Sequence, residues 1–543
     1  LIITGSKGQS LIKLRSSIPG STWDINLDSL ATQEVKYVNV KDSNATNQTI
    51  TAYESVDMGN NTNWVFDDTL DPDSPYRYWV SDISSNWNNT SNWSLSSGGS
   101  GGESVPTIGY VAIFNNAKNG NCTLNIDATV EAIIIDGYSG EFSMGSYNLT
   151  TNSDFTISSG SFLGSNTNLV IGGDFIKIGG SFTAPNNMSI GGSFSNTGTF
   201  NHNLGTVTFN SNSIGNSISL NGARLYNLVF NGIGGAWTIN DDLLVDNNFT
   251  ITNGRVIQVG DIEIGNDFVI NGGRLNCSDP INKSFKVRGS FSITPINTGA
   301  FNRYTGSGTE GDPYLIRDIY DLQAMKCFLS ASFKLNNDII AGTGPYYDTG
   351  NWNLGLGFEP IGSYTNPFTG NLDGQNYTIQ GLYINRSTTD YVGLLGNKSG
   401  GSINNIGLIG GSISGRDYVG GLVGYNGSSP ISNSYATGSV SGSGSVGGLV
   451  GYNYSSSSIS NSYATGSVSG DWYVGGLVGE NRYSTITNSY ATGSVSGSDY
   501  VGGLVGENWL GASITNSYAT GSVSGSYSVG GLVGWNYFSS SIT

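Results

Sequence analysis

Residues 419–442 read VGGLVGYNGSSPISNSYATGSVSG, and this stretch recurs almost unchanged towards the end of the chain. A degenerate copy begins at Val392, and the first six residues begin again at Val446, Val474, Val501 and Val529, which defines a 27–28-residue repeat. The apolar residues form short runs that are broken by Gly and Asn, a pattern typical of strands joined by turns. We therefore predict three short strands and three turns in each repeat.

Near-identical copies are expected to stack in register as coils of a parallel β-helix, because a single repeat cannot bury its own apolar face. The predicted fold class is therefore all-β, with parallel β-helix (β-solenoid) segments in tandem. Stacking predicts internal columns of Leu and Tyr, and a column of Asn at a turn, where stacked amides bond along the axis. The expected columns are Leu422, Leu449, Leu477, Leu504 and Leu532; Tyr435, Tyr463, Tyr490 and Tyr518; and Asn433, Asn461, Asn488 and Asn516. Gly451 and Gly479 are expected at turns that need a positive φ.

A weaker repeat lies upstream and has a shorter period. Phenylalanines recur in two parallel series, Phe155, Phe175 and Phe194 in one and Phe162, Phe182 and Phe200 in the other. Their spacing predicts smaller coils of the same kind. In these coils Arg255 and Arg274 would stack one coil apart with solvated side chains, the alternative being a weak anion site.

These patterns divide the chain into five segments. We predict the C-terminal part of a preceding β-rich module (1–66), a linker (67–78), a β-solenoid with coils of about 19–20 residues (79–303), a bridge or cap (304–391), and a β-solenoid of 27–28-residue repeats (392–543). One short amphipathic helix is predicted near residues 318–329, with Asp318 as its N-cap, where it would cover an exposed coil edge. The chain begins without Met and stops inside a repeat, so we expect it to be a piece of a longer protein.

Composition excludes several classes of function. The 22 basic and 39 acidic residues give a net charge of −17, which disfavours nucleic acid and anionic membrane surfaces as partners. No apolar run is long enough to insert into a bilayer. With one histidine and three widely spaced cysteines, a zinc site or a histidine-based catalytic triad is not expected.

The repeat sequence resembles the GLUG repeat of bacterial surface proteins. The resemblance rests on Gly-Gly-Leu-Val-Gly-x-Asn followed by Ile-[Ser/Thr]-Asn-Ser-Tyr-Ala-Thr-Gly, and on lead-in motifs such as residues 306–316, so it covers about residues 304–543. Residues 79–300 resemble filamentous-haemagglutinin-type modules more loosely, through Asn92-Trp93 and Val105-Pro106. The resemblance implies a large secreted adhesin. Such repeats also occur beside a zinc protease domain, but this sequence contains no His-Glu-x-x-His motif.

Catalytic and cofactor sites are not predicted. Parallel β-helices also host lyases and glycosidases that use paired carboxylates, and the nearest candidates are Asp241, Asp242 and Asp373. Asp241 and Asp242 are adjacent and would face opposite sides of a strand, while Asp373 precedes a glycine in a predicted turn. Calcium binding is an alternative for an acidic cluster in the linker, whose spacing matches no standard loop: Asp67, Asp68, Asp71 and Asp73.

The positions that vary between repeats carry the functional hypothesis. They lie in the loop between Asn and Ile and just before each Val, and they hold aromatic residues that suit sugar stacking or protein contact. The candidate binding edge comprises Tyr454, Tyr483, Trp509, Tyr537, Trp472 and Tyr473. Neutral drift on a tolerant surface is the alternative explanation.

The predicted function is that of an extracellular or cell-surface adhesin or structural stalk, not an enzyme. Expected partners are glycans or proteins of a host or matrix surface, or neighbouring copies of the same chain. The alternatives are a carbohydrate-active β-helix enzyme and a passive spacer that presents another domain.

Overall fold

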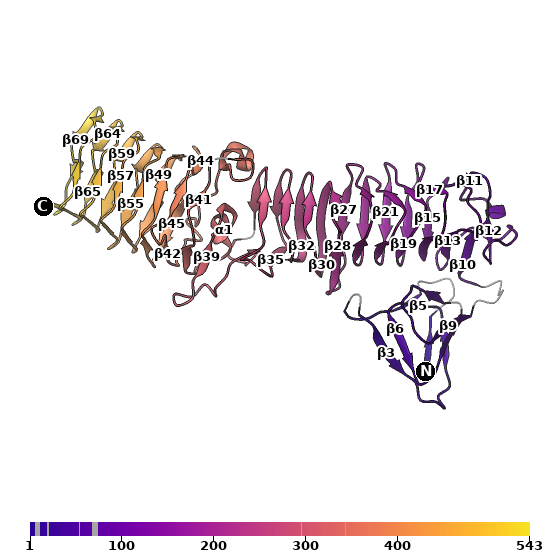
Figure 1. Ribbon diagram of the computed structural model, residues 1–543. Coiled ribbons are helices and arrows are strands. Elements are labelled where there is room, and N and C mark those ends of the chain that lie inside the picture. The colour runs from indigo at the N-terminus through magenta and orange to yellow at the C-terminus, as the bar shows by residue number, and fades with distance from the viewer. Residues whose placement is uncertain (6–10, 19–20, 54, 68–73, 295, 343) are drawn as a thin grey trace. The chain divides into compact units, whose positions relative to one another are not determined.

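The computed structural model describes residues 1–5, 11–18, 21–53, 55–67, 74–294, 296–342 and 344–543 (Figure 1). Within these ranges the strands pair in parallel, apart from an antiparallel pair between β10 (Tyr76–Trp79) and β12 (Trp93–Ser94) and two antiparallel single bridges. Two compact units are present, residues 1–265 with 271–278, and residues 266–270 with 279–543. The predicted all-β parallel β-helix fold is confirmed.

The N-terminal part of the chain already forms short parallel coils. Val35, Val38, Val40 and Ile50 are fully buried in their core. The three sheets contain β1 (Ile2–Thr4), β4 (Glu34–Lys36), β7 (Ile50–Tyr53) and β9 (Trp64–Asp67); β2 (Ile12–Leu14), β5 (Val38–Val40) and β8 (Val56–Asp57); and β3 (Trp23–Asn26) and β6 (Ser43–Thr46).

The larger solenoid of the first unit has stacked phenylalanines in its interior. Phe155, Phe175 and Phe194 are partners in register on β19 (Phe155–Ile157), β22 (Phe175–Lys177) and β25 (Phe194–Asn196). Phe162, Phe182 and Phe200 are partners on β20 (Ser161–Leu163), β23 (Ser181–Thr183) and β26 (Phe200–Asn201). The rings of Phe162 and Phe182 lie 4.8 Å apart and are nearly parallel. These pairings confirm the smaller coils that the phenylalanine spacing predicts.

The predicted capping helix is present in the second unit and within the predicted residues, but it is shorter than expected. Helix α1 spans Ile319–Ala324 and continues as a 3-10 turn, η2 (Met325–Cys327). The side chain of Asp318 accepts a hydrogen bond from the Asp321 amide, as an N-cap should. The predicted capping helix is therefore confirmed, but all six residues of α1 are buried, so it lacks the solvent-facing side that an amphipathic helix would have. The polar Asp321 tolerates burial because it forms ion pairs with Arg303 and Arg317.

Each full repeat between Asp417 and Ser524 contains five strands, not the three predicted. One extra strand arises because the Val-Gly-Gly-Leu-Val run is divided at its glycines, and the other arises because the Ile-to-Val segment forms three strands. The first full coil contains β49 (Asp417–Gly420), β50 (Val423–Gly427), β51 (Pro430–Ser432), β52 (Tyr435–Ala436) and β53 (Ser439–Ser441). Later coils repeat β49 as β54 (Gly444–Gly447), β59 (Trp472–Gly475), β64 (Asp499–Gly502) and β69 (Tyr527–Gly530), and β50 as β55 (Val450–Tyr454), β60 (Val478–Arg482), β65 (Val505–Trp509) and β70 (Val533–Asn536).

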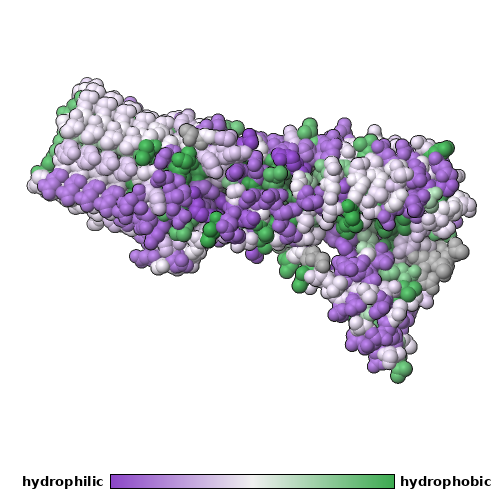
Figure 2. All heavy atoms as spheres, viewed as in Figure 1, coloured by the Kyte–Doolittle hydropathy of each residue, from purple (hydrophilic) through white to green (hydrophobic). Residues whose placement is uncertain are grey.

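Residue columns run along this solenoid as predicted, with one correction. Leu422, Leu449 and Leu477 are fully buried, which confirms the Leu column. The tyrosines also stack, with Tyr435 and Tyr463 rings 4.7 Å apart and 2° from parallel, but they face outward and only the neighbouring alanines are buried. Their placement in the interior was wrong because alternate residues of a strand face opposite sides. Figure 2 shows the resulting rows of like hydropathy along the C-terminal solenoid.

Two asparagine columns stabilise the turns. Asn433, Asn461, Asn488 and Asn516 adopt φ between 47° and 49°, which confirms the predicted turn column. A second column, inside the coil, was not predicted: the side-chain amides form an unbroken chain of hydrogen bonds 2.7–2.9 Å long through Asn426, Asn453, Asn481, Asn508 and Asn536. Lys398 occupies the same register before Asn426. It is fully buried, and desolvation lowers the pKa of its amine to about 7.

The turn assignment of Gly451 and Gly479 was also wrong. Both lie within strands, β55 and β60, and neither has a positive φ. A Cβ atom on Gly451 would lie 2.6 Å from the amide nitrogen of Val419, and one on Gly479 would lie 2.6 Å from that of Val446. These glycines are needed because the backbone of the preceding coil passes too close for any side chain.

Candidate functional site

One edge of the C-terminal solenoid carries tyrosines in a strained backbone conformation. Tyr391, Tyr418, Tyr473 and Tyr500 each precede the Val of a repeat, and their φ angles lie between 52° and 60°. This left-handed conformation costs a non-glycine residue on the order of 1–2 kcal/mol. The rings stack in pairs, at 5.0 Å for Tyr391 with Tyr418 and for Tyr473 with Tyr500. Strain that recurs at the same position in successive coils marks this edge as a candidate functional surface.

A second column lies beside these tyrosines, at the position before the buried asparagine. Its members are partners in register from coil to coil: Tyr425, Tyr452, Glu480, Glu507 and Trp535. The tyrosines of the first column pack on it, with ring centroids 5.6 Å apart for Tyr418 and Tyr452. The two columns together form a surface rich in aromatic rings, which we call the aromatic edge.

The predicted loop aromatics border the aromatic edge but do not form one aligned column. Tyr454, Arg482 and Trp509 are partners in register, so Tyr483 lies one residue out of step. The rings of Tyr454 and Tyr483 still meet, at 6.1 Å. Tyr483 and Tyr537 are each 50% exposed, whereas Trp509 is half-buried and lies 4.2 Å from the Arg482 guanidinium. The offset arises because Tyr483 is the second residue after its asparagine, whereas Tyr454 and Trp509 directly follow theirs.

Trp472 and Tyr473 have different surroundings although they are adjacent. Trp472 is 50% exposed and lies in register between Gly444 and Asp499. Tyr473 is half-buried and stacks on Tyr500. The structure therefore brings Tyr473 into the aromatic edge and leaves Trp472 as a separate exposed ring.

A charged cluster interrupts the aromatic edge, and the sequence reasoning missed it. Glu480 and Glu507 replace the tyrosines found at the same repeat position in earlier coils, and Arg482 forms ion pairs with both, at 2.7 and 3.0 Å. Burial raises the pKa of Glu480 to about 7. The available signal was the change from Tyr425 and Tyr452 to two glutamates at an otherwise aromatic position.

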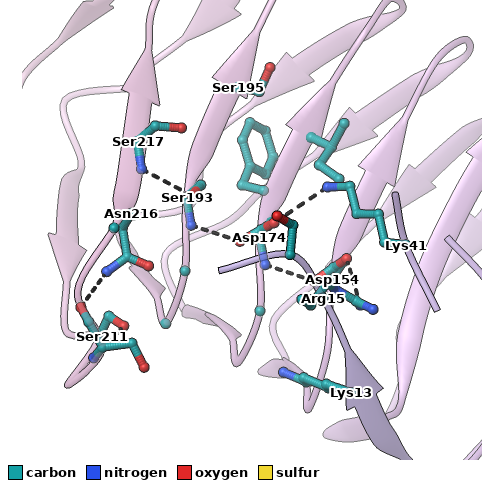
Figure 3. Close-up of a pocket in the computed structure, with 18 of the residues that line it drawn as sticks. Lys13, Arg15, Lys41, Asp154, Asp174, Ser193, Ser195, Ser211, Asn216 and Ser217 are labelled. Carbon is teal, nitrogen blue, oxygen red and sulfur yellow. Dashed lines mark hydrogen bonds and ion pairs between the residues drawn. The ribbon is translucent and has the colours of Figure 1, made fainter. Parts of the chain in front are cut away.

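A polar pocket of about 730 Å³ lies in the first unit (Figure 3). Asp154 accepts a hydrogen bond from the Asp174 amide at 2.8 Å, and Asp174 accepts one from the Ser193 amide at the same distance. Arg15 lies 3.3 Å from Asp154, and Lys41 lies 3.4 Å from Asp174. Because these charged side chains form ion pairs across the pocket, we infer that their main role is to stabilise its walls.

The carboxylates considered for catalysis do not converge. Asp241 follows β30 (Asn227–Ile239) in a corner and accepts hydrogen bonds from the Leu220 and Asn221 amides. Asp242 accepts one from the Asp261 amide. Asp373, in the other unit, accepts hydrogen bonds from the Gln375 backbone amide of its own turn and from the Asn405 side chain of the next coil. Each carboxylate thus serves local backbone or turn structure.

Other predicted features are placed as follows. Arg255 and Arg274 are exposed partners in register, as predicted. Of the acidic residues proposed for calcium, Asp68, Asp71 and Asp73 lie outside the described residues. Within the described ranges, no group of three or more His, Cys, Asp or Glu side chains is arranged to hold a metal ion. In the same ranges, no helix has the length and apolarity needed to cross a bilayer.

Comparison with known proteins supports the repeat assignment. The sequence profile of the GLUG motif matches residues 415–441, 442–469, 470–496 and 497–524, which confirms that these repeats are GLUG motifs. Halomucin of Haloquadratum walsbyi is 41% identical over 119 residues, which are 21% of this chain and 1% of halomucin. A protein of Evansella cellulosilytica, provisionally named as a Gly-rich membrane protein, is 38% identical over 112 residues, 20% of this chain and 12% of that protein.

One solved structure is also similar to part of this chain. It is a protein of Bacteroides ovatus provisionally named as an immunoglobulin A1 protease, with 27% identity, a TM-score of 0.36, and coverage of 44% of this chain and 77% of that one. The chain spans only a small part of the curated relatives it matches, 1% of halomucin and 12% of the Evansella protein.

Proposed function

We propose that this chain is part of a repetitive secreted or cell-surface protein that acts as an adhesive stalk and has no enzymatic role. The GLUG motifs support a repetitive surface protein, and the names of the two relatives refer to a mucin and to a membrane protein. The likeness of residues 79–300 to filamentous-haemagglutinin modules is part of the same proposal.

The observation that carries the proposal is the aromatic edge and the rings that border it. Successive coils hold Tyr and Trp there at about the 4.8 Å spacing of neighbouring strands, while most other outward positions of the repeat hold Ser, Thr, Asn or Gly. Several weak contacts along one row add by avidity. Glycans or proteins of a host or matrix surface, or neighbouring copies of the chain, are the proposed partners, without calcium or another cofactor.

The test replaces the four predicted loop aromatics, Tyr454, Tyr483, Trp509 and Tyr537, with Ser. We expect attachment to a glycan array or to cells to be lost, while the melting temperature changes little because none of these side chains belongs to the buried core. The matched control replaces the four outward stacked tyrosines of another face, Tyr435, Tyr463, Tyr490 and Tyr518, with Ser and retains attachment.

Three outcomes contradict the proposal. Equal attachment by both variants would show that the loop aromatics are not part of the binding surface. Release of reducing sugar from a bound polysaccharide would favour a carbohydrate-active enzyme. Absence of binding by the unmodified chain would favour a passive spacer.

A further inference from the structure

Two glutamates are stacked inside the aromatic edge. Glu480 on β60 and Glu507 on β65 are Cα partners one coil apart. They are only 4% and 2% exposed. Water therefore does little to screen the repulsion between their carboxylates.

A single arginine nitrogen contacts both carboxylates. Nη2 of Arg482 lies 2.7 Å from Oε2 of Glu480 and 3.0 Å from Oε2 of Glu507. The Arg482 guanidinium is held over the Trp509 ring at 4.2 Å. With both carboxylates ionised, this cluster would carry two negative charges against one positive charge.

The hydrogen bonds of the Glu480 carboxyl leave one of its oxygens able to carry a proton. Its Oε1 accepts a hydrogen bond from the Ser445 hydroxyl. Ser445 occupies the repeat position at which the neighbouring coils have tyrosine. Oε2 of Glu480 is buried and forms no hydrogen bond, despite its short distance to Arg482. The titratable and charged groups that act on Glu480 are Arg482, Glu507, Tyr418, Tyr452 and Tyr473. Burial raises the pKa of each of the three tyrosines, so they remain neutral near pH 7.

We propose that Glu480 and Glu507 hold one proton between them in the folded protein, and that losing it weakens the contact between their two coils. With the proton in place, one negative charge remains to match Arg482. The inference concerns the coils themselves and does not depend on what the aromatic edge binds.

The direction of the pH effect follows from the raised pKa of Glu480. Burial, and also the negative charge of the Glu507 carboxylate, raise this pKa to about 7 from an ordinary value of 4.5. Between these two pH values the folded state keeps a proton that the opened state has lost. Stability of the two coils should therefore fall as the pH rises from 4.5 to about 7, and level off above it.

Hydrogen exchange of peptides covering β60 and β65, corrected for the intrinsic effect of pH on exchange, tests the proposal. We expect the protection factor of the full chain to fall by roughly 70-fold between pH 5 and pH 8, as pKa values of 4.5 and about 7 imply. In Glu480→Gln and in Glu507→Gln the remaining carboxylate is matched by Arg482, so protection should be nearly constant with pH and higher than that of the unmodified chain at pH 8.

The control is Glu310→Gln, which removes an exposed glutamate and should keep the pH dependence. Glu131, Asp321 and Lys398 also have pKa values of about 7, but they are unchanged in every variant and contribute equally. Parallel profiles for the unmodified chain and both Gln variants would overturn the proposal, and so would constant protection in the unmodified chain. Attachment to glycans does not enter this measurement, so its result is separate from that of the proposed function.

Discussion

The solenoid of the first unit and the C-terminal solenoid use aromatic residues in opposite ways. In the first, Phe155, Phe162, Phe175 and Phe182 are at most 1% exposed and fill the coil. In the second, Val, Leu, Ile and Ala fill the coil, and tyrosines such as Tyr463 stack outside it. Aromatic rings thus fill the interior of one solenoid and lie on the surface of the other. A regular spacing of aromatic residues in the sequence does not by itself distinguish the two cases.

The largest expected effect is in the interior of the first unit. Phe182→Ala removes a ring that packs on Phe162, Phe175 and Phe200 at 4.8–5.4 Å. The cavity left behind should destabilise the fold by about 3–5 kcal/mol, measured as a lower urea midpoint by circular dichroism. A loss below about 1 kcal/mol would contradict the assignment of these rings to packing.

A smaller loss is expected from the buried asparagine column of the C-terminal solenoid. Asn481→Ala leaves the Asn453 amide without its acceptor and the Asn508 oxygen without its donor, at a cost of about 1–3 kcal/mol. Hydrogen exchange across β55, β60 and β65 should increase. Asn488→Gly is the matched control, because it removes an exposed amide and keeps the left-handed backbone. Equal effects from both variants would show that the buried column has no special role.

The smallest effect is expected at the outward tyrosines. Tyr463→Ser removes a ring stacked on Tyr435 and Tyr490 at 4.7 and 4.8 Å, but it leaves the buried Ala464 in place. Each aromatic pair contributes about 0.5–1.5 kcal/mol, so the urea midpoint should fall less than in Phe182→Ala. A loss as large as that of the interior phenylalanine would erase the difference between the two solenoids.

Much of the fold was readable from periodicity. The longer repeat predicted the register of the Leu and turn Asn columns, and the shorter upstream period predicted the Phe pairs, because identical coils can stack only with like residues in contact. The number of strands in a repeat was not readable, since a Gly-Gly pair is compatible with a bend or with a continuous strand. The role of Gly451 was not readable either, because it depends on how closely the backbone of the preceding coil approaches.

The candidate site was predicted only in part. The sequence located the variable aromatics near Tyr454 and Trp509, because the constant positions were already assigned to packing and turns. It did not reveal that Tyr473 and Tyr500 adopt left-handed backbone angles, or that Glu480 and Glu507 are buried against one arginine. Those features depend on contacts between adjacent coils.

The sequence by itself determined that this protein is a stack of parallel coils, because an almost invariant repeat makes identical residues neighbours at every step. The tertiary structure alone decided which side of the coil wall each column faces. That choice depends on where each five-strand coil bends, and the bend before Tyr463 falls at Asn461, whose φ is 48°. The stacking of the coils therefore follows from the repetition of the sequence. Which tyrosine, asparagine and glutamate side chains are buried follows instead from the closed path of the backbone around each coil.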